Sequence, residues 1–251
     1  MMAARQRRPW DAFGCATDRR ALSWRPDSAD RCQPCGWRLR RGARFCDGCG
    51  VRLGVGTGRA EHKHVTVMFA DVVGSMQIAA ALGPERFWEV IVEVVDRCVA
   101  VVHGYGGSVD KFTGDGVMAV FGAPVALEEH AFRACLAALD IQGELVRFAD
   151  EVERADGIAL QLRVGLNSGQ VLVGEVGPAA IGYTAIGEHV GFAQRMESVA
   201  PSGGVMVSES TARLVDGAAV LGPRELVRVK GVDTPVAARR LLAVETARAA
   251  S

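Results

Sequence analysis

The chain has 251 residues, of which 49% are hydrophobic and 23% charged, and its formal net charge at pH 7 is zero. These proportions are ordinary for a globular protein and exclude a chain that is disordered throughout. The longest apolar run, at 90–102, is interrupted by three charged residues, so we expect no membrane span. No apolar segment follows the Arg-rich start, so we also expect no secretory signal and a cytoplasmic protein.

The positive charge is concentrated at the start of the chain, where residues 1–60 hold thirteen Arg against five Asp. Residues 1–31 show neither helical nor strand periodicity and are predicted to form a disordered basic arm. Such basicity can favour nucleic acid or an acidic surface. Aromatic residues are not interleaved with the basic ones, however, which argues against a nucleic-acid binder.

Two C-x-x-C-G pairs follow the arm. Their cysteines are Cys32, Cys35, Cys46 and Cys49. Four thiolates with this spacing can enclose one tetrahedral Zn²⁺, and the glycine after each pair lets the backbone curl round the sulfurs. We therefore predict a small zinc ribbon at 32–50 with one structural Zn²⁺ and, as a further role, a protein partner. A disulfide-bonded ribbon and an unmetallated one are the alternatives.

Three further cysteines lack this spacing: Cys15, Cys98 and Cys135. The last two lie in helical patterns, which predicts that they pack in a core. A Gly-rich stretch at 51–61 is predicted to be a linker. The main domain should then span 62–244, followed by a tail at 245–251.

Hydrophobic periodicity predicts the elements of the main domain. In chain order these are a strand at 64–71, a helix at 76–103 interrupted at Gly83-Pro84, strands at 107–113 and 116–121, a helix at 127–154, and strands at 159–167 and 170–176. This is the βαββαβ order of a ferredoxin-like α+β fold. A C-terminal extension should add a strand near 181–186, a helix near 188–199, a strand at 204–208, and a hairpin that pairs 224–230 with 235–242.

Two carboxylates stand at the ends of predicted strands. The first strand stops on Asp71, and Asp115 lies between two glycines at the tip of a hairpin. Carboxylate oxygens are the ligands that Mg²⁺ and Mn²⁺ take in phosphate sites, so the pair predicts a divalent-metal phosphate site. The plainer explanation is that Asp115 forms the turn and Asp71 caps the strand.

Five motifs, in this order and at these spacings, resemble the class III nucleotidyl cyclases over roughly residues 62–244. They are Phe-Ala-Asp-x-x-Gly at 69–74, Lys-x-x-Gly-Asp-Gly at 111–116, Arg-x-Gly-x-x-x-Gly at 163–169, the segment 182–187 with Arg-Met-Glu at 195–197, and Val-Lys-Gly at 229–231. The resemblance implies the class III cyclase fold. It also implies an adenylate cyclase, in which the ribose 3′-hydroxyl of ATP attacks the α-phosphorus to give 3′,5′-cyclic AMP and pyrophosphate.

The resemblance implies that Asp71 and Asp115 are catalytic and hold two Mg²⁺ or Mn²⁺ ions per active site. Gly74, Ser75 and the neighbouring backbone amides would cradle phosphate at a helix N-terminus. Here the chain departs from the family, because Met76 stands where a threonine is common.

Base choice rests, by the same resemblance, on Lys111 and Thr184. An ammonium can donate to adenine N1 and a threonine hydroxyl can accept from N6, so ATP is the implied substrate. Arg195 would steady the charge that develops on the phosphates, and Lys230 would contact the triphosphate. The plainer explanations are a strand-end charge for Lys111 and a solvated hairpin for Lys230.

A second departure is Gly191, which stands one helical turn before Arg195, where the family has an asparagine that holds the ribose. We therefore expect weak activity. The family places the metal ligands and the base-selecting residues of one site on different subunits, which implies a homodimer with active sites at the interface. The alternatives are a nucleotide-binding pseudo-cyclase or heterodimer subunit, and an adaptor that acts through its zinc ribbon.

Overall fold

The computed structural model describes residues 31–32, 35–40, 43, 45–50, 60–176 and 182–245. The chain divides into two compact units, Met1–Thr57 and Gly58–Ser251. Cys15, nearly all of the predicted basic arm, most of the linker and the tail beyond Glu245 lie outside the described residues. In the part of the chain that is described, no helix is both long enough and apolar enough to cross a membrane.

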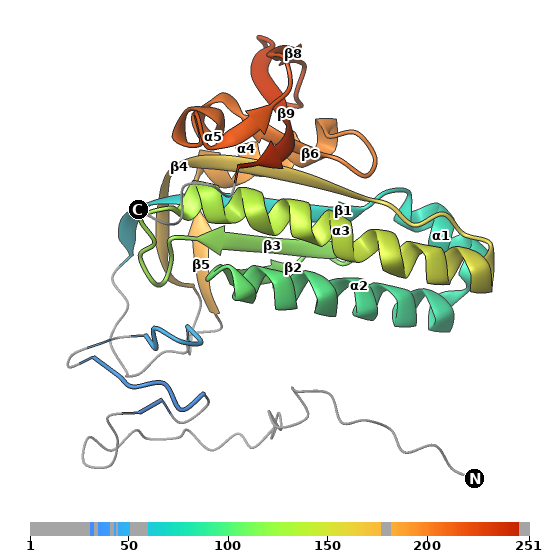
Figure 1. The fold of residues 1–251 in the computed structure, drawn as a ribbon, viewed down its shortest axis with the longest axis horizontal. Coiled ribbons are helices and arrows are strands. Elements are labelled where there is room, and N and C mark those ends of the chain that lie inside the picture. The colour runs from blue at the N-terminus through green and yellow to red at the C-terminus, as the bar shows by residue number, and fades with distance from the viewer. Residues whose placement is uncertain are drawn as a thin grey trace. The chain divides into compact units, whose positions relative to one another are not determined.

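The second unit is built on one mixed sheet, with strands in the order β2-β3-β1-β4-β6-β9-β7, β5 paired with β4 and β8 with β9 (Figure 1). The strands are β1 (Glu61–Val72), β2 (Ser108–Phe112), β3 (Gly116–Phe121), β4 (Leu162–Val176), β5 (Gly182–Ile186), β6 (Val205–Ser208), β7 (Ala219–Leu221), β8 (Glu225–Val227) and β9 (Val236–Val244). The β2-β3-β1-β4 part is fully antiparallel, and with its two helical connections it is the predicted ferredoxin-like core.

Helices cover the two faces of this sheet. They are α1 (Ser75–Leu82), α2 (Pro84–Gly104), α3 (His130–Asp156), α4 (Glu188–Val199) and α5 (Glu209–Leu214). Helices α2 and α3 run side by side along one face (Figure 1). Successive side chains of β1 point to opposite faces. Met68, Ala70 and Val72 join the α2–α3 core, and Val65, Val67 and Phe69 join a second core that includes Ala193 of α4.

The elements follow the sequence pattern closely, with one exception in the core. Residues 159–167 and 170–176 were predicted as two strands, but β4 is continuous from Leu162 to Val176. The glycine at 169 does not end the strand. A Cβ at Gly169 would lie 2.4 Å from the His189 ring, so the glycine serves the close crossing of α4 over β4. Cys98 and Cys135 are buried in the core, as predicted.

Two short elements have no counterpart in the prediction, α5 and β7. They have six and three residues, too few for a hydrophobic period to show. One local signal existed, because the Ser208 hydroxyl accepts a hydrogen bond from the Thr211 backbone N–H at 3.3 Å and caps α5. The final hairpin forms as expected, with Glu225 opposite Ala238 and Val227 opposite Val236.

Candidate functional site

The structure brings Asp71 and the Asp115 turn together at one end of the sheet. Asp71, the penultimate residue of β1, lies opposite Gly116 of β3. The Thr113 hydroxyl donates to Asp71 Oδ1 at 2.5 Å, and the Val72 N–H donates to the Asp115 carbonyl at 3.3 Å. Asp71, Asp115 and Thr113 are called the carboxylate cluster below.

Glycine is required at Gly116 for this approach. A Cβ there would lie 2.0 Å from the Ala70 carbonyl oxygen and 2.1 Å from Asp71 Oδ1. Gly114 has φ 107°, a conformation that residues with a side chain rarely adopt. The Gly-Asp-Gly sequence is therefore needed both to form the turn and to let it approach Asp71.

Burial raises the pKa of Asp71, and the negative charge of Asp115 adds to the rise, while the Thr113 hydrogen bond and Arg163 oppose it. Two adjacent carboxylates in a partly buried position repel each other, and a divalent cation bound by both relieves that repulsion. Their oxygens are the hard donors that Mg²⁺ and Mn²⁺ prefer. The residues present therefore fit the predicted metal ions.

A partly buried ion pair lies next to the carboxylate cluster. Arg163, opposite Asp71 on β4, places its Nε 3.0 Å from Oε1 of the buried Glu197 on α4. Burial raises the pKa of Glu197 to about 7; Asp71 and Asp115 push it in the same direction and Arg163 opposes them. Both residues lie in the cyclase-like motifs, but sequence reasoning assigned them no role.

Lys111 and Thr184, the predicted base-selecting residues, are in contact. Lys111 Nζ donates to Thr184 Oγ1 at 3.1 Å, which joins β2 to β5. A third residue, which the sequence analysis did not identify, sits between them: Asp110 accepts from the Thr184 hydroxyl and the Ala185 N–H, both at 2.9 Å. Asp110, Lys111 and Thr184 are called the β2–β5 cluster below.

Arg195 and Lys230 are also brought together, but through the backbone. Arg195 Nε donates to the Lys230 carbonyl oxygen at 2.8 Å. A Cβ at Gly191, one turn earlier on α4, would lie 3.6 Å from Arg195 Nη1, which is ordinary contact. Gly191, Arg195 and Lys230 are called the α4 cluster below.

The predicted phosphate cradle is the start of α1. Gly74 has φ 67° and caps the helix, and its carbonyl accepts from the N–H groups of Gln77 and Ile78 at 3.0 Å. The first backbone N–H groups of a helix have no partner within the helix, which suits an anion. Ser75 is half-buried, whereas Met76 is 78% exposed, so the residue that departs from the family points into solvent.

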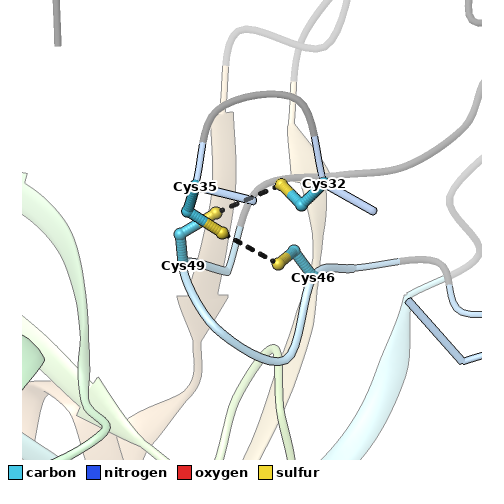
Figure 2. Close-up of side chains that lie close together, drawn as sticks. All are labelled: Cys32, Cys35, Cys46 and Cys49. Carbon is cyan, nitrogen blue, oxygen red and sulfur yellow. Dashed lines mark hydrogen bonds between the residues drawn. The ribbon is translucent and has the colours of Figure 1, made fainter. Parts of the chain in front are cut away.

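The first unit places the sulfurs of Cys32, Cys35, Cys46 and Cys49 within 4.8 Å of one another (Figure 2). Each C-x-x-C-G pair has the same local structure, in which the glycine N–H donates to the carbonyl of the first cysteine. The Gly36 N–H donates to the Cys32 carbonyl at 2.7 Å, and the Gly50 N–H donates to the Cys46 carbonyl at 2.8 Å. Both glycines have φ 72°. The backbone thus curls round the sulfurs as the sequence suggested.

Comparison with known proteins identifies the domain. The family model for the adenylate and guanylate cyclase catalytic domain matches residues 57–239. The chain therefore belongs to the class III nucleotidyl cyclase family, whose fold it shares. It is 32% identical to adenylate cyclase 1 of Rhizobium meliloti over 199 residues, which are 78% of this chain and 29% of that protein. The chain thus spans under a third of this relative's length.

Two solved structures extend the comparison. The adenylyl cyclase CyaB from P. aeruginosa superposes with a TM-score of 0.70 at 27% identity, over 75% of this chain and 98% of that one. The guanylate cyclase domain of RhGC from Catenaria anguillulae, solved in complex with GTP, gives 0.67 at 28% identity, over 74% and 100%. The proteins similar to this chain thus include both adenylyl cyclases and guanylyl cyclases.

Proposed function

We propose that the domain is an adenylate cyclase that converts ATP to 3′,5′-cyclic AMP and pyrophosphate. The observation that carries this proposal is the Lys111–Thr184 contact at 3.1 Å, in a chain whose Asp115 turn also lies against the end of β1 that holds Asp71. Lys111 is half exposed, so its ammonium can reach a base. Guanine would present its own N1–H donor to that ammonium, whereas adenine presents an acceptor.

In this mechanism Asp71 and Asp115 would hold two divalent ions, whose positive charge would make the ribose hydroxyl easier to deprotonate and would offset the charge of the phosphates. The bond that forms joins the 3′-oxygen to the α-phosphorus. The bond that breaks joins the α-phosphorus to the oxygen of the leaving pyrophosphate, and the hydroxyl proton is released to solvent. Arg195 and Lys230 donate to the phosphate oxygens as charge moves onto them, and the α1 N-terminus at Gly74 and Ser75 binds phosphate.

We further propose that the active form is a homodimer whose sites are shared between subunits. No hydrogen bond or ion pair within the described residues joins the carboxylate, β2–β5 and α4 clusters to one another. Large apolar side chains beside the β2–β5 cluster are exposed, among them Phe112 and Ile186. A second copy of the chain would cover this surface and bring complementary clusters together, as the family resemblance implies.

Assay of the purified protein for cyclic AMP and cyclic GMP tests the proposal. We expect cyclic AMP in excess over cyclic GMP, at a low rate, and more with Mn²⁺ than with Mg²⁺ because Mn²⁺ is less demanding in geometry. Asp71→Asn, which keeps the size of the side chain and removes its charge, should abolish the product. Nucleotide binding without either product would favour the pseudo-cyclase or heterodimer subunit, which Gly191 and the exposed Met76 motivate.

For the first unit we propose one structural Zn²⁺ held by the four cysteines. Cys32 Sγ lies 3.6 Å from Cys49 Sγ, and Cys35 Sγ lies 3.4 Å from Cys46 Sγ. Four sulfurs at the usual Zn–S distance sit about 3.8 Å apart at the corners of a tetrahedron, whereas a disulfide bond is about 2.05 Å long. The spacing therefore favours a metal over a disulfide.

The backbone also favours the thiolate form that zinc needs. The Gly48 N–H donates to Cys46 Sγ at 3.3 Å. Burial by itself would raise the pKa of the Cys46 thiol, but hydrogen bonds from the Cys49 and Gly48 N–H groups outweigh it and lower this pKa to about 7. The segments that carry the two cysteine pairs pack closely, since a Cβ at Gly48 would lie 2.8 Å from Trp37.

Protein purified without added metal should contain about one zinc per chain. Cys46→Ser should lose it, whereas Cys135→Ala, a change in the core of the other unit, should keep it. Exchange into Co²⁺ should produce the absorption bands of tetrahedral thiolate coordination. Iron in place of zinc, no metal at all, or zinc retained by Cys46→Ser would each contradict the proposal.

A further inference from the structure

We propose that Asp110 makes the site selective for adenine by fixing the direction of the Thr184 hydroxyl group. The inference rests on the proposed nucleotide site but concerns a residue that lies beneath it. The Asp110 side chain is 4% exposed, against 50% for Lys111, so Asp110 acts through its neighbours and not by touching the base. It is a positioning residue.

The hydrogen bonds of Asp110 leave Thr184 a single role. Asp110 Oδ2 accepts the Ala185 backbone N–H, and Oδ1 accepts the Thr184 hydroxyl, both at 2.9 Å. A carboxylate can only accept hydrogen bonds, and a hydroxyl has a single hydrogen. Thr184 must therefore donate that hydrogen to Asp110. Oγ1 keeps two lone pairs. Lys111 Nζ donates to one of them at 3.1 Å, and the other remains for a ligand.

Lys111 is fixed in the same way. Its Nζ lies 3.1 Å from Asp110 Oδ1 as well as 3.1 Å from Thr184 Oγ1. An ammonium has three hydrogens, so one is left over. The cluster therefore presents one donor and one acceptor side by side. Adenine offers the complementary acceptor at N1 and donor at N6, whereas guanine offers a donor at N1 and an acceptor at O6.

Without Asp110, the Thr184 hydroxyl could turn and donate to guanine O6. An untethered threonine would thus pair with either adenine N6 or guanine O6, and the carboxylate removes this freedom, while Lys111 opposes the guanine N1–H in either case. The position of Asp110 follows from an irregularity in the pairing of β2 with β3, where the register shifts between Val109 and Lys111. Such a bulge turns the extra residue out of the ladder, and here Asp110 bonds to β5 instead.

Asp110→Asn tests the inference because it reverses the polarity of one atom. The Ala185 N–H still needs an acceptor, so the amide oxygen should stay on it. The amide NH₂ then takes the place of Oδ1, so the Thr184 hydrogen becomes free to point at the base and Lys111 loses the acceptor that holds it. We expect the preference for ATP over GTP to fall by about tenfold, the effect of one hydrogen bond reversing. A purely structural loss would weaken both nucleotides equally.

The preference is measured twice, as the ratio of kcat/KM values and as the ratio of concentrations at which ATP and GTP displace a fluorescent ATP analogue. The displacement needs no turnover. If wild-type protein makes no cyclic nucleotide, the proposed function fails while the displacement ratio still tests Asp110. An unchanged ratio in Asp110→Asn would overturn the inference. Asp96→Asn, an exposed change on α2, should leave the ratio as in wild type.

Changes at Thr184 test the same device even if Asp110→Asn folds poorly. Thr184→Ser keeps a hydroxyl within reach of Asp110 and should keep the ATP preference. Thr184→Val removes the acceptor and should reduce it. Equal ATP-to-GTP preferences for Thr184→Ser and Thr184→Val would show that the hydroxyl does not contribute to base selection.

Discussion

Mixing Asp71→Ala protein with Lys111→Ala protein should restore cyclase activity that neither variant has by itself. Each single change should reduce kcat by at least about 10³-fold, because one removes a ligand of the metal ions and the other a contact to the base. In a mixed dimer with shared sites, one site carries both changes and the other carries neither. Random mixing should therefore recover about a quarter of wild-type activity.

A matched pair of variants provides the control. Asp71→Ala mixed with Asp115→Ala should recover nothing, because both changes fall in the same cluster and each site of the mixed dimer keeps one of them. Heterodimer formation is checked by co-purification of two differently tagged chains. Failure of the first mixture to recover, despite proven heterodimers, would show that each site lies within one chain or that the protein is inactive.

Gly191→Asn should raise kcat by 10²- to 10³-fold, the usual effect of one hydrogen-bond donor that acts in the transition state. The structure has room for the side chain, since a Cβ at Gly191 meets only Arg195 Nη1, at 3.6 Å. The change should also stabilise α4 by a few tenths of a kcal/mol, because glycine is the poorer helix former. The gain should appear in kcat and not in ATP affinity.

Gly191→Ala separates the two effects. Alanine stabilises the helix by up to about 1 kcal/mol but brings no amide, so thermal stability should rise while kcat stays low. If Gly191→Asn folds normally and kcat does not change, another group already holds the ribose, or a different defect such as Met76 limits the site. If Gly191→Ala raises kcat as much as Gly191→Asn does, helix stability and not the hydrogen bond is the cause.

The strands and helices of the core could be predicted because their hydrophobic patterns are long and regular. The βαββαβ order followed from them, and the meeting of Asp71 with the Asp115 turn followed from the family resemblance. Asp110 could not be found in this way. Its role depends on a one-residue irregularity in β2 and on contact with β5, far along the chain, and neither leaves a local signal. Glu197 was missed for a similar reason, since only the crossing of α4 over β4 brings it to Arg163.

The hydrogen bond from Arg195 to Lys230 uses a peptide carbonyl, which every amino acid at position 230 would supply. A guanidinium has five N–H groups, and this bond uses the one at Nε, which leaves the four N–H groups of the terminal nitrogens, beside Gly191 and Gly231, for other partners. The orientation of the Arg195 guanidinium is therefore set by the backbone at position 230, whereas the positive charge beside it comes from the Lys230 side chain. Evolution can change or delete that charge without turning Arg195 away.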